Sequence, residues 1–151
     1  MSEAQEILTP LRTVAVRVGH HVGFSGTRHG MTVNQLSKVT DLIGRYDWLH
    51  HGDCVGADRQ AHLAAVILKV RTEVHPPNVD KYRAFCDGDV VHEPKDYQGR
   101  NRDIVDSTLR LIAMPYTRVE DRRSGTWWTI GYARRTGKPV TIVYPDGSLG
   151  Q

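Results

Sequence analysis

Three short stretches of this chain combine glycine with hydroxyl, carboxylate or guanidinium side chains. They cover residues 23–28, 52–58 and 122–129. Glycine permits a close approach of the backbone to a ligand, hydroxyl groups donate and accept hydrogen bonds, and arginine presents a planar fork to phosphate or carboxylate groups. The three stretches therefore indicate a site for an anionic ligand.

The first and third stretches each lead into a predicted helix. The first amides of a helix have no intrahelical acceptor, and the helix dipole places positive charge there, so anions bind at this end. Neither stretch contains the GxGxxG or GxxxxGK[ST] pattern of nucleotide-binding loops. A plain tight turn and an ordinary capped helix are the alternative interpretations. The candidate ligand-binding residues of these two stretches are Ser25, Gly26, Thr27, Arg28, Arg123, Ser124, Gly125 and Thr126.

The second stretch is rich in carboxylates. Asp53 or Asp58 could accept hydrogen bonds from ribose hydroxyls or act as a general base. His62 follows Asp58 by four residues, which places both on one face of a helix. The alternative is structural, with Asp58 capping the helix and pairing with Arg59 or His62. The sequence leaves both interpretations open.

Five segments have the pattern of buried strands, and helical patterns separate them. The strands are predicted at 21–24, 46–51, 73–75, 109–115 and 140–144, and the helices at 32–44, from 58 to about 68, 100–108 and 125–135. This alternation predicts an α/β fold with a mostly parallel sheet of five strands, or slightly more, and helices on both faces. If the strand order is 3-2-1-4-5, the first and fourth strands are neighbours. The first and third stretches then face each other across one crevice.

Two segments have less regular patterns. Residues 13–18 alternate like a strand, so residues 1–18 are predicted to form an N-terminal extension or edge strand, followed by a single domain over 19–151. Residues 78–99 show no clear period, and a loop of this length is usually functional. Tyr82, Phe85 and Tyr97 could stack on a base there. The alternative is that these rings close the edge of the core.

The length and composition favour a single domain that needs no membrane, metal or cofactor. The chain has 151 residues, a formal charge of +3 and a sequence pI near 9.0, which mildly favours anionic partners. No apolar run approaches the roughly 20 residues of a membrane span, so no membrane partner is expected. Cys54 and Cys86 lack close ligand spacing, and the adjacent His20 and His21 would point to opposite faces of a strand. No metal and no cofactor are therefore expected, and two thiols suit a cytoplasmic protein.

Four motifs in order resemble the SLOG superfamily, which includes the Lonely Guy phosphoribohydrolases and the Rossmann-like domain of DNA-processing protein A. The resemblance spans residues 20 to 145 and looks strongest to small bacterial and phage members. It rests on Gly26-Thr27-Arg28, on residues 51–58 with Ala61-His62, on Arg100-Asn101 before a strand ending in Ala113-Met114-Pro115, and on Ser124-Gly125-Thr126.

The resemblance implies a Rossmann-like three-layer sandwich with a pocket for a nucleotide or an ADP-ribose-like ligand. It also implies a homo-oligomer, either a dimer or a tetramer. It places Gly52, Asp53, Asp58 and Asn101 near the sugar or base. The further ligand-binding candidates that it adds are Gly56, Arg100 and Pro115.

This chain departs from the Lonely Guy motif PGGxGTxxE, whose glutamate is catalytic. Aligned on Gly125-Thr126, that glutamate falls on Thr129, and Pro-Gly-Gly falls on residues 121–123. A threonine cannot replace a carboxylate that activates water or stabilises positive charge. The catalytic candidates that could substitute for it are Asp53, Asp58, Asp103 and Glu120, and nothing in the sequence selects one of them.

Three functions are therefore open. The first is a nucleotide-binding protein that senses or sequesters its ligand at the crevice between the first and fourth strands. The second is a nucleotide N-glycosidase with a non-standard catalytic carboxylate. The third is a single-stranded nucleic-acid binder, favoured by the basic balance and by Trp127-Trp128. At least one of these two tryptophans is expected in the core, because both lie within a helical pattern.

Overall fold

The computed structural model describes residues 18–151 as one α/β unit. The strand predicted at 13–18 falls almost entirely outside the described residues. The described residues form one sheet in the order β4-β3-β2-β1-β5-β6-β7, in which every pairing except β6–β7 is parallel. Its strands are β1 (His21–Gly26), β2 (Trp48–His51), β3 (Arg71–Val74), β4 (Val90–Val91), β5 (Arg110–Met114), β6 (Val140–Val143) and β7 (Leu149–Gly150).

The sheet order confirms the sequence prediction. The five predicted strands are β1, β2, β3, β5 and β6, and their order in the sheet is 3-2-1-4-5. The two additional strands lie at the sheet edges. β4 arises within the irregular segment 78–99, and β7 follows the turn after β6. Each has only two residues, too few for a recognisable alternation of apolar and polar side chains.

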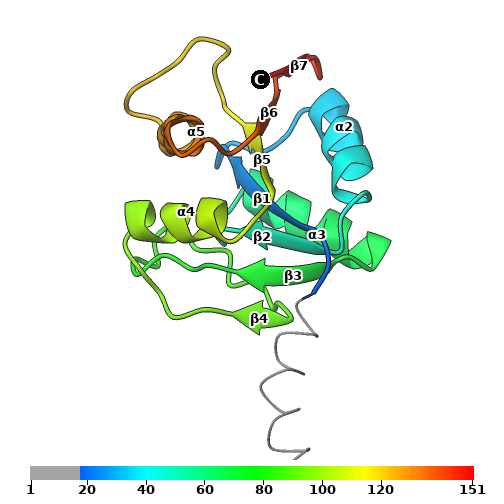
Figure 1. The fold of residues 1–151 in the computed structure, drawn as a ribbon, viewed down its shortest axis with the longest axis vertical. Helices are drawn as coiled ribbons and strands as arrows, with labels where there is room; N and C mark the ends of the chain where they lie inside the picture. The colour runs from blue at the N-terminus through cyan, green and yellow to red at the C-terminus, as the bar shows by residue number, and fades with distance from the viewer. Residues whose placement is uncertain (1–17) are drawn as a thin grey trace, which may run out of the picture.

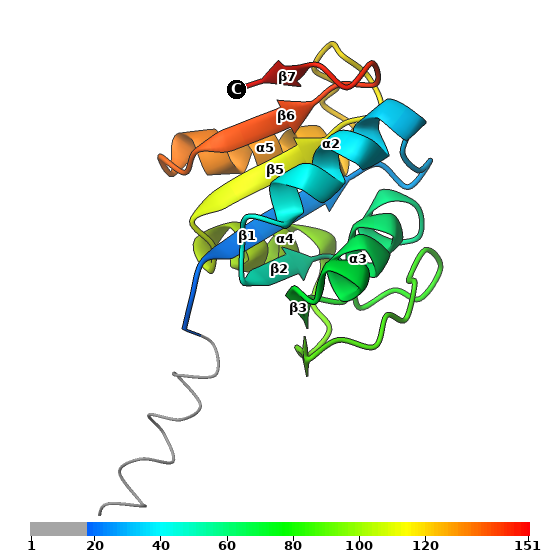
Figure 2. The ribbon, with the colours of Figure 1, turned by 90° about the vertical axis from the view of Figure 1, so that its right-hand side faces the viewer.

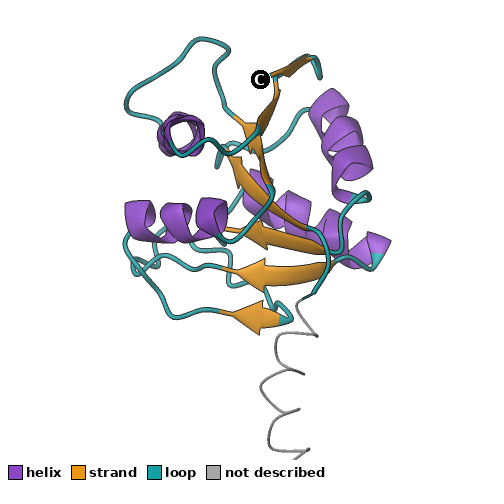
Figure 3. Ribbon diagram, viewed as in Figure 1, coloured by secondary structure: helices purple, strands orange, loops and turns teal. Residues whose placement is uncertain are grey.

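Within residues 18–151, four helices cover the two faces of the sheet. They are α2 (Val33–Ile43), α3 (Ala57–Leu68), α4 (Tyr97–Asp106) and α5 (Gly125–Arg135). α2 and α3 pack on one face, and α4 and α5 pack on the other (Figures 1 and 2). The coloured elements in Figure 3 show the resulting three layers of helix, sheet and helix. None of the helices in residues 18–151 combines the length and the apolar character that crossing a membrane requires.

Alternation along the strands separates two hydrophobic cores. In β5, Ile112 packs in the core under α2 and α3, whereas the flanking Leu111 and Ala113 pack under α5. Successive strand residues point to opposite faces, so a single strand contributes to both cores. Each helix is thereby held against the sheet through one apolar face.

Local capping fixes where the helices begin. Thr32 and Gln35 form the predicted capping box of α2. Ser124 caps α5, because its hydroxyl oxygen accepts a hydrogen bond from the Trp127 N–H at 3.2 Å. α4 begins at Tyr97, three residues before the predicted start at Arg100, because the Asp96 carboxylate caps it.

The pairing of β1 with β5 places two loops side by side. Gly26 lies opposite Met114 at the carboxyl ends of these strands. The next residue, Thr27, donates its N–H to the Met114 carbonyl at 3.0 Å. The loop after β1 and the loop that leads to α5 therefore leave the same edge of the sheet, as the strand order predicts.

Candidate functional site

A cavity of about 780 Å³ opens at the carboxyl ends of β1, β2 and β5. Its walls come from the loops after these strands and from the first turns of α4 and α5. The predicted ligand-binding residues that line it are Ser25, Gly26, Thr27, Arg28, Gly52, Asp58, Arg100, Asn101, Arg123, Ser124, Gly125 and Thr126. Of the other ligand-binding candidates, Asp53, Gly56 and Pro115 do not line it.

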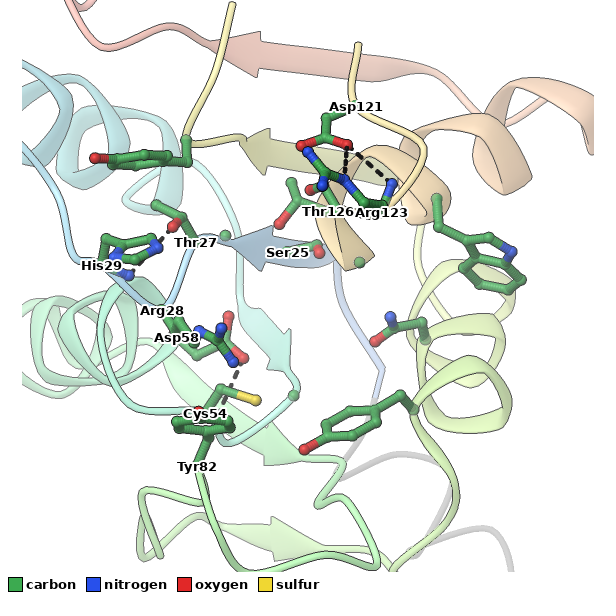
Figure 4. Close-up of a pocket in the computed structure, with 18 of the residues that line it drawn as sticks. Ser25, Thr27, Arg28, His29, Cys54, Asp58, Tyr82, Asp121, Arg123 and Thr126 are labelled. Carbon is green, nitrogen blue, oxygen red and sulfur yellow. Dashed lines mark hydrogen bonds and ion pairs between the residues drawn. The ribbon is translucent and has the colours of Figure 1, made fainter.

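Figure 4 shows how the labelled side chains lie around this cavity. One side carries Arg28, Asp58, Cys54 and Tyr82, and the other side carries Asp121, Arg123 and Thr126. Ser25, at the end of β1, lies between the two sides. The first and third polar stretches of the sequence therefore do face each other across one cavity.

Two glycines allow the loop after β1 to pack against the start of α3. Gly56 has a φ of +87°, and a Cβ there would collide with the backbone carbonyl of Arg28. A Cβ on Gly26 would lie 2.6 Å from the Cβ of Ala57. The Ala57 N–H donates to the Thr27 carbonyl at 3.0 Å. Gly56 thus supports the cavity from behind and does not line it.

The buried guanidinium of Arg100 joins α4 to the loop after β2. It donates to the carbonyls of Gly52 and His75, the second at 3.1 Å, and to the Cys54 sulfur at 3.3 Å. It also donates to the Asn101 side chain at 2.5 Å. Because its donors are directed at protein acceptors, Arg100 contributes positive charge to the cavity and holds its wall.

Asp58 is the catalytic candidate that lines the cavity. Its side chain is 4% exposed, and Oδ2 accepts a hydrogen bond from the Cys54 N–H at 3.2 Å. Oδ1 has no hydrogen-bond partner among the described residues. Burial raises the pKa of Asp58 to about 6, and this effect outweighs the Arg100 charge and the amides of Cys54 and Gly26, which lower the pKa. Near neutral pH, Asp58 can therefore both take up and release a proton.

The remaining catalytic candidates lie outside the cavity. Asp53 is fully buried behind it, where its carboxylate pairs with Arg83 Nε at 2.9 Å and accepts the Cys86 N–H at 2.8 Å. Asp103 pairs with Lys95 at 2.6 Å on the exposed side of α4. Glu120 lies in the exposed segment before α5. Burial and partners thus distinguish Asp58 from carboxylates that sequence reasoning treated alike.

The charged groups around the cavity favour an anion. Four arginines line it, and two aspartates oppose them. Arg28 lies over the Tyr82 ring, with its guanidinium carbon 4.2 Å from the ring centroid. Asp121 accepts the Arg123 N–H at 3.0 Å, which shapes the loop before α5. The α5 N-terminus adds the positive end of its dipole, and a Cβ on Gly125 would meet nothing within 4 Å.

Aromatic rings form another part of the cavity wall. Tyr82 and Tyr97, from the irregular segment, line it, whereas Phe85 lies outside with 59% of its surface exposed. Trp127 packs in the core under α5, and Trp128 lines the cavity. The expectation that at least one of the two tryptophans lies in the core is therefore confirmed. A flat, unsaturated group could stack on these rings.

Several lining residues were not among the ligand-binding candidates that the sequence provided. They are Phe24, His29, Cys54, Gln98, Tyr116, Thr117, Asp121, Arg122 and Trp128. The His29 and Tyr116 rings contact each other, with centroids 4.3 Å apart. Tyr116 and Thr117 directly follow the strand predicted at 109–115, so a systematic survey of residues after each predicted strand would have found them.

Neither thiol in the described chain is suited to act as a nucleophile at neutral pH. Burial and the Asp58 charge raise the pKa of Cys54. Burial and the adjacent Asp53 raise the pKa of Cys86 to about 12. Both thiols therefore stay protonated, and the thiol is the unreactive form.

Thr129 occupies the position of the Lonely Guy catalytic glutamate. It is fully buried, and its hydroxyl donates to the Gly125 carbonyl at 2.8 Å within α5. This position therefore supports the helix and has no access to the cavity. A carboxylate-dependent reaction in this cavity would have to use another residue.

Several solved structures share the fold of this chain, whereas no family model and no curated protein matches it. The molybdenum cofactor binding protein from Rippkaea orientalis is 20% identical, with a TM-score of 0.67 over 84% of this chain and 77% of that chain. DNA processing protein A from Streptococcus pneumoniae is 20% identical, with a TM-score of 0.59 over 82% of this chain and 50% of that chain. DNA processing protein A from Helicobacter pylori, which binds single-stranded DNA, is 16% identical, with a TM-score of 0.60 over 86% of this chain and 67% of that chain.

This chain has a Rossmann-like α/β fold. The similarity confirms the fold that the four motifs imply. At these identities it shows the fold alone, and the chain spans half the length of the pneumococcal protein. The ligand and the reaction must therefore be argued from the cavity itself.

Proposed function

We propose that this protein binds a nucleotide or an ADP-ribose-like ligand in the cavity and acts as a sensor or a store of that ligand. The observation that carries the proposal is that two polar stretches, one after β1 and one at the start of α5, line the same cavity. Each provides hydroxyl groups and an arginine, and one provides a helix N-terminus. Together they form a site with many donors for phosphate groups.

In this proposal, the phosphate groups lie between the end of β1 and the start of α5. Ser25, Thr27 and Thr126 provide hydroxyl donors, and the first amides of α5 point toward the same space. Arg28 provides the charge. The base lies against the aromatic wall of the cavity. A volume of about 780 Å³ falls within the usual range for small-molecule pockets.

The first test is native mass spectrometry of the gently purified protein, followed by identification of any released compound. Isothermal titration with AMP, ADP and ADP-ribose then measures affinity. An intact nucleotide that co-purifies or binds supports the proposal. If none of these compounds binds and nothing co-purifies, the proposal is wrong.

Gly125→Glu offers a specific variant, because this position is the first residue of α5 and faces open space. The added carboxylate suits a helix N-terminus but repels a phosphate there. Val33→Glu is the matched control, since it adds the same charge at the first residue of α2, where the side chain is 85% exposed. We expect nucleotide affinity to fall at least about tenfold in the first variant and to remain unchanged in the second.

The second candidate function is hydrolysis of the N-glycosidic bond of a nucleotide. Asp58 favours it, because this buried carboxylate lines the cavity and has an unpaired oxygen and a raised pKa. Asp58 would activate water or protonate the leaving base. Chromatographic detection of a free base, lost in Asp58→Asn, would support this reaction. Binding without any base release would leave the sensor or store as the function.

The third candidate function is binding of single-stranded nucleic acid. The aromatic wall and the four arginines of the cavity favour it. Fluorescence anisotropy with a labelled oligonucleotide tests it at several salt concentrations. Salt-dependent binding that Arg28→Gln weakens would support a nucleic-acid partner. Absent binding, or binding that salt does not affect, would exclude it.

We also propose a cytoplasmic homo-oligomer. Along α3, Leu63, Val66, Ile67 and Leu68 expose between 40% and 80% of their surface, and exposed apolar side chains of this kind occur at protein–protein interfaces. Light scattering on wild type and Ile67→Glu tests this part. An oligomer that the variant dissociates supports it, and a monomeric wild type contradicts it. The two free thiols are consistent with a reducing compartment.

A further inference from the structure

Four metal-ligating side chains gather on one face of the sheet, away from the cavity described above. They come from β2 (His50), β3 (Glu73) and the residues just after β3 and β4 (His75 and His92). His50 pairs with Glu73 in the register, and the His92 N–H donates to the Val74 carbonyl at 2.9 Å. Paired residues and alternate residues share a face. The four side chains therefore lie together.

This face is the one covered by α4. Gly23 pairs with His50 in the sheet, and a Cβ on Gly23 would contact Ile104 of α4 at 2.9 Å. None of the four side chains lines the nucleotide cavity. A ligand of this cluster would consequently occupy a separate site.

The ring nitrogens converge on one carboxylate oxygen. Glu73 Oε2 lies 3.1 Å from His50 Nδ1 and 3.2 Å from His92 Nε2. It lies 4.0 Å from His75 Nε2, and the ligand atoms of Glu73, His75 and His92 all lie within 4.8 Å of one another. Ligand atoms around a tetrahedral zinc ion lie roughly 3.3 Å apart, given bonds of about 2.0–2.2 Å. Small side-chain adjustments would suffice to coordinate an ion.

We propose that this cluster binds a zinc ion, with Glu73, His75 and His92 as ligands and His50 as the fourth. Imidazole nitrogen and carboxylate oxygen are the donors that zinc takes in proteins. His92, whose side chain is 36% exposed, gives the ion a way in from solvent.

The tautomer of His50 is compatible with this role. A histidine that ligates through Nδ1 carries its proton on Nε2, and His50 Nε2 lies 2.7 Å from His21 Nδ1. His21 can accept that proton in a hydrogen bond. Such a bond to a second histidine nitrogen fixes the orientation of the ligand.

A second cluster, of His51, His62 and Cys86, is a useful contrast. The Asp53 N–H donates to His51 Nδ1 at 3.0 Å, so the proton of the neutral ring lies on Nε2. That nitrogen then donates to His62 Nδ1 at 2.9 Å and cannot ligate a metal. The first cluster is hydrogen-bonded as well, with His50 Nδ1 2.9 Å from His75 Nε2. The second cluster serves as an internal control because a backbone amide fixes the tautomer of His51.

The proposal departs from the prediction, made from the sequence, that the protein binds no metal. That expectation depended on close spacing of cysteine and histidine along the chain. Here the ligands are spread over residues 50–92 and come together through the pairing of three strands. Local spacing therefore carried no signal of this site.

The test uses the full chain, stripped of metal with EDTA and free of nucleotide. Zinc is added in an isothermal titration, and cobalt(II) is added separately to record its visible absorption. We expect one zinc per chain, a rise in melting temperature with zinc, and the absorption of tetrahedral cobalt. Absence of saturable zinc binding would overturn the proposal.

Three variants locate the ion. His92→Ala removes a partly exposed ligand of the proposed zinc site. We expect zinc affinity to fall more than about 100-fold in this variant. His62→Gln, in the contrasting network, and His20→Ala, an exposed histidine, are expected to bind zinc like the wild type. Unchanged affinity in His92→Ala, or an equal loss in His20→Ala, would show that zinc binds elsewhere.

Discussion

The Asp58→Asn variant is expected to gain stability relative to the wild type as the pH rises from acidic to neutral. The folded chain raises the pKa of Asp58 from 3.8 to about 6 through burial. A tenfold change in a proton-binding constant is worth about 1.4 kcal/mol. The ionised carboxylate therefore destabilises the folded state by about 3 kcal/mol at pH values above 6. Asparagine has nearly the same shape and does not ionise.

The sign of the pH dependence follows from which state holds more protons. Between pH 3.8 and about 6, the folded chain keeps the Asp58 proton, whereas the unfolded chain releases it. The contribution of Asp58 to stability is therefore most favourable below pH 3.8, falls as the pH rises, and is constant above about 6. Asparagine removes this fall and retains an oxygen that accepts the Cys54 N–H.

Urea unfolding of wild type and Asp58→Asn, at about pH 4 and about pH 7.5, measures this effect. The difference in unfolding free energy between variant and wild type should be about 2.5 kcal/mol more favourable to the variant at the higher pH, because part of the full effect is already present at pH 4. Asp41→Asn, at an exposed position of α2, controls for the loss of one charge. If the difference for Asp58→Asn is the same at both pH values, burial does not raise the pKa of this group.

Further predictions concern the frame around the cavity. Gly56→Ala should lower the unfolding free energy by more than about 2 kcal/mol, because residue 56 has a positive φ and its Cβ would collide with the Arg28 backbone. An unchanged urea midpoint would contradict the close packing of the loop after β1 against the start of α3. Arg83→Ala should cost about 3–5 kcal/mol by leaving the buried Asp53 unpaired. Lys95→Ala, in the exposed pair with Asp103, should cost less than about 1 kcal/mol, and equal losses would refute this reasoning. Cys86 should react slowly with iodoacetamide at about pH 8, because its pKa is about 12; alkylation at the rate of a free thiol would refute it.

The sequence alone determined the arrangement of the main strands and most helix starts. Apolar periodicity located β1, β2, β3, β5 and β6, and the capping residues Thr32 and Ser124 marked the starts of α2 and α5. These signals are local, since they depend on side chains within a few residues of one another. The order of the strands then placed the ends of β1 and β5 side by side, and with them the two polar stretches.

The sequence could not choose among the candidate carboxylates. Asp53, Asp58, Asp103 and Glu120 have the same chemistry, and they differ in burial and in partners. Asp53 forms an ion pair with Arg83, and Asp103 forms one with Lys95. Asp58, in contrast, lines the cavity and has a carboxylate oxygen without a hydrogen-bond partner among the described residues. Arg83 is 30 residues from Asp53 along the chain, so only the path of the segment after β3 reveals this pairing.

The histidine and glutamate cluster was decided by the tertiary structure in the same way. His50, Glu73 and His92 are well separated in the sequence, and no motif joins them. Their side chains converge because β2, β3 and β4 pair in parallel in one register, which puts them on one face. A shift of one residue in a strand would turn its side chain to the other face. Local patterns thus determined the elements and their order, and strand register determined which side chains share a site.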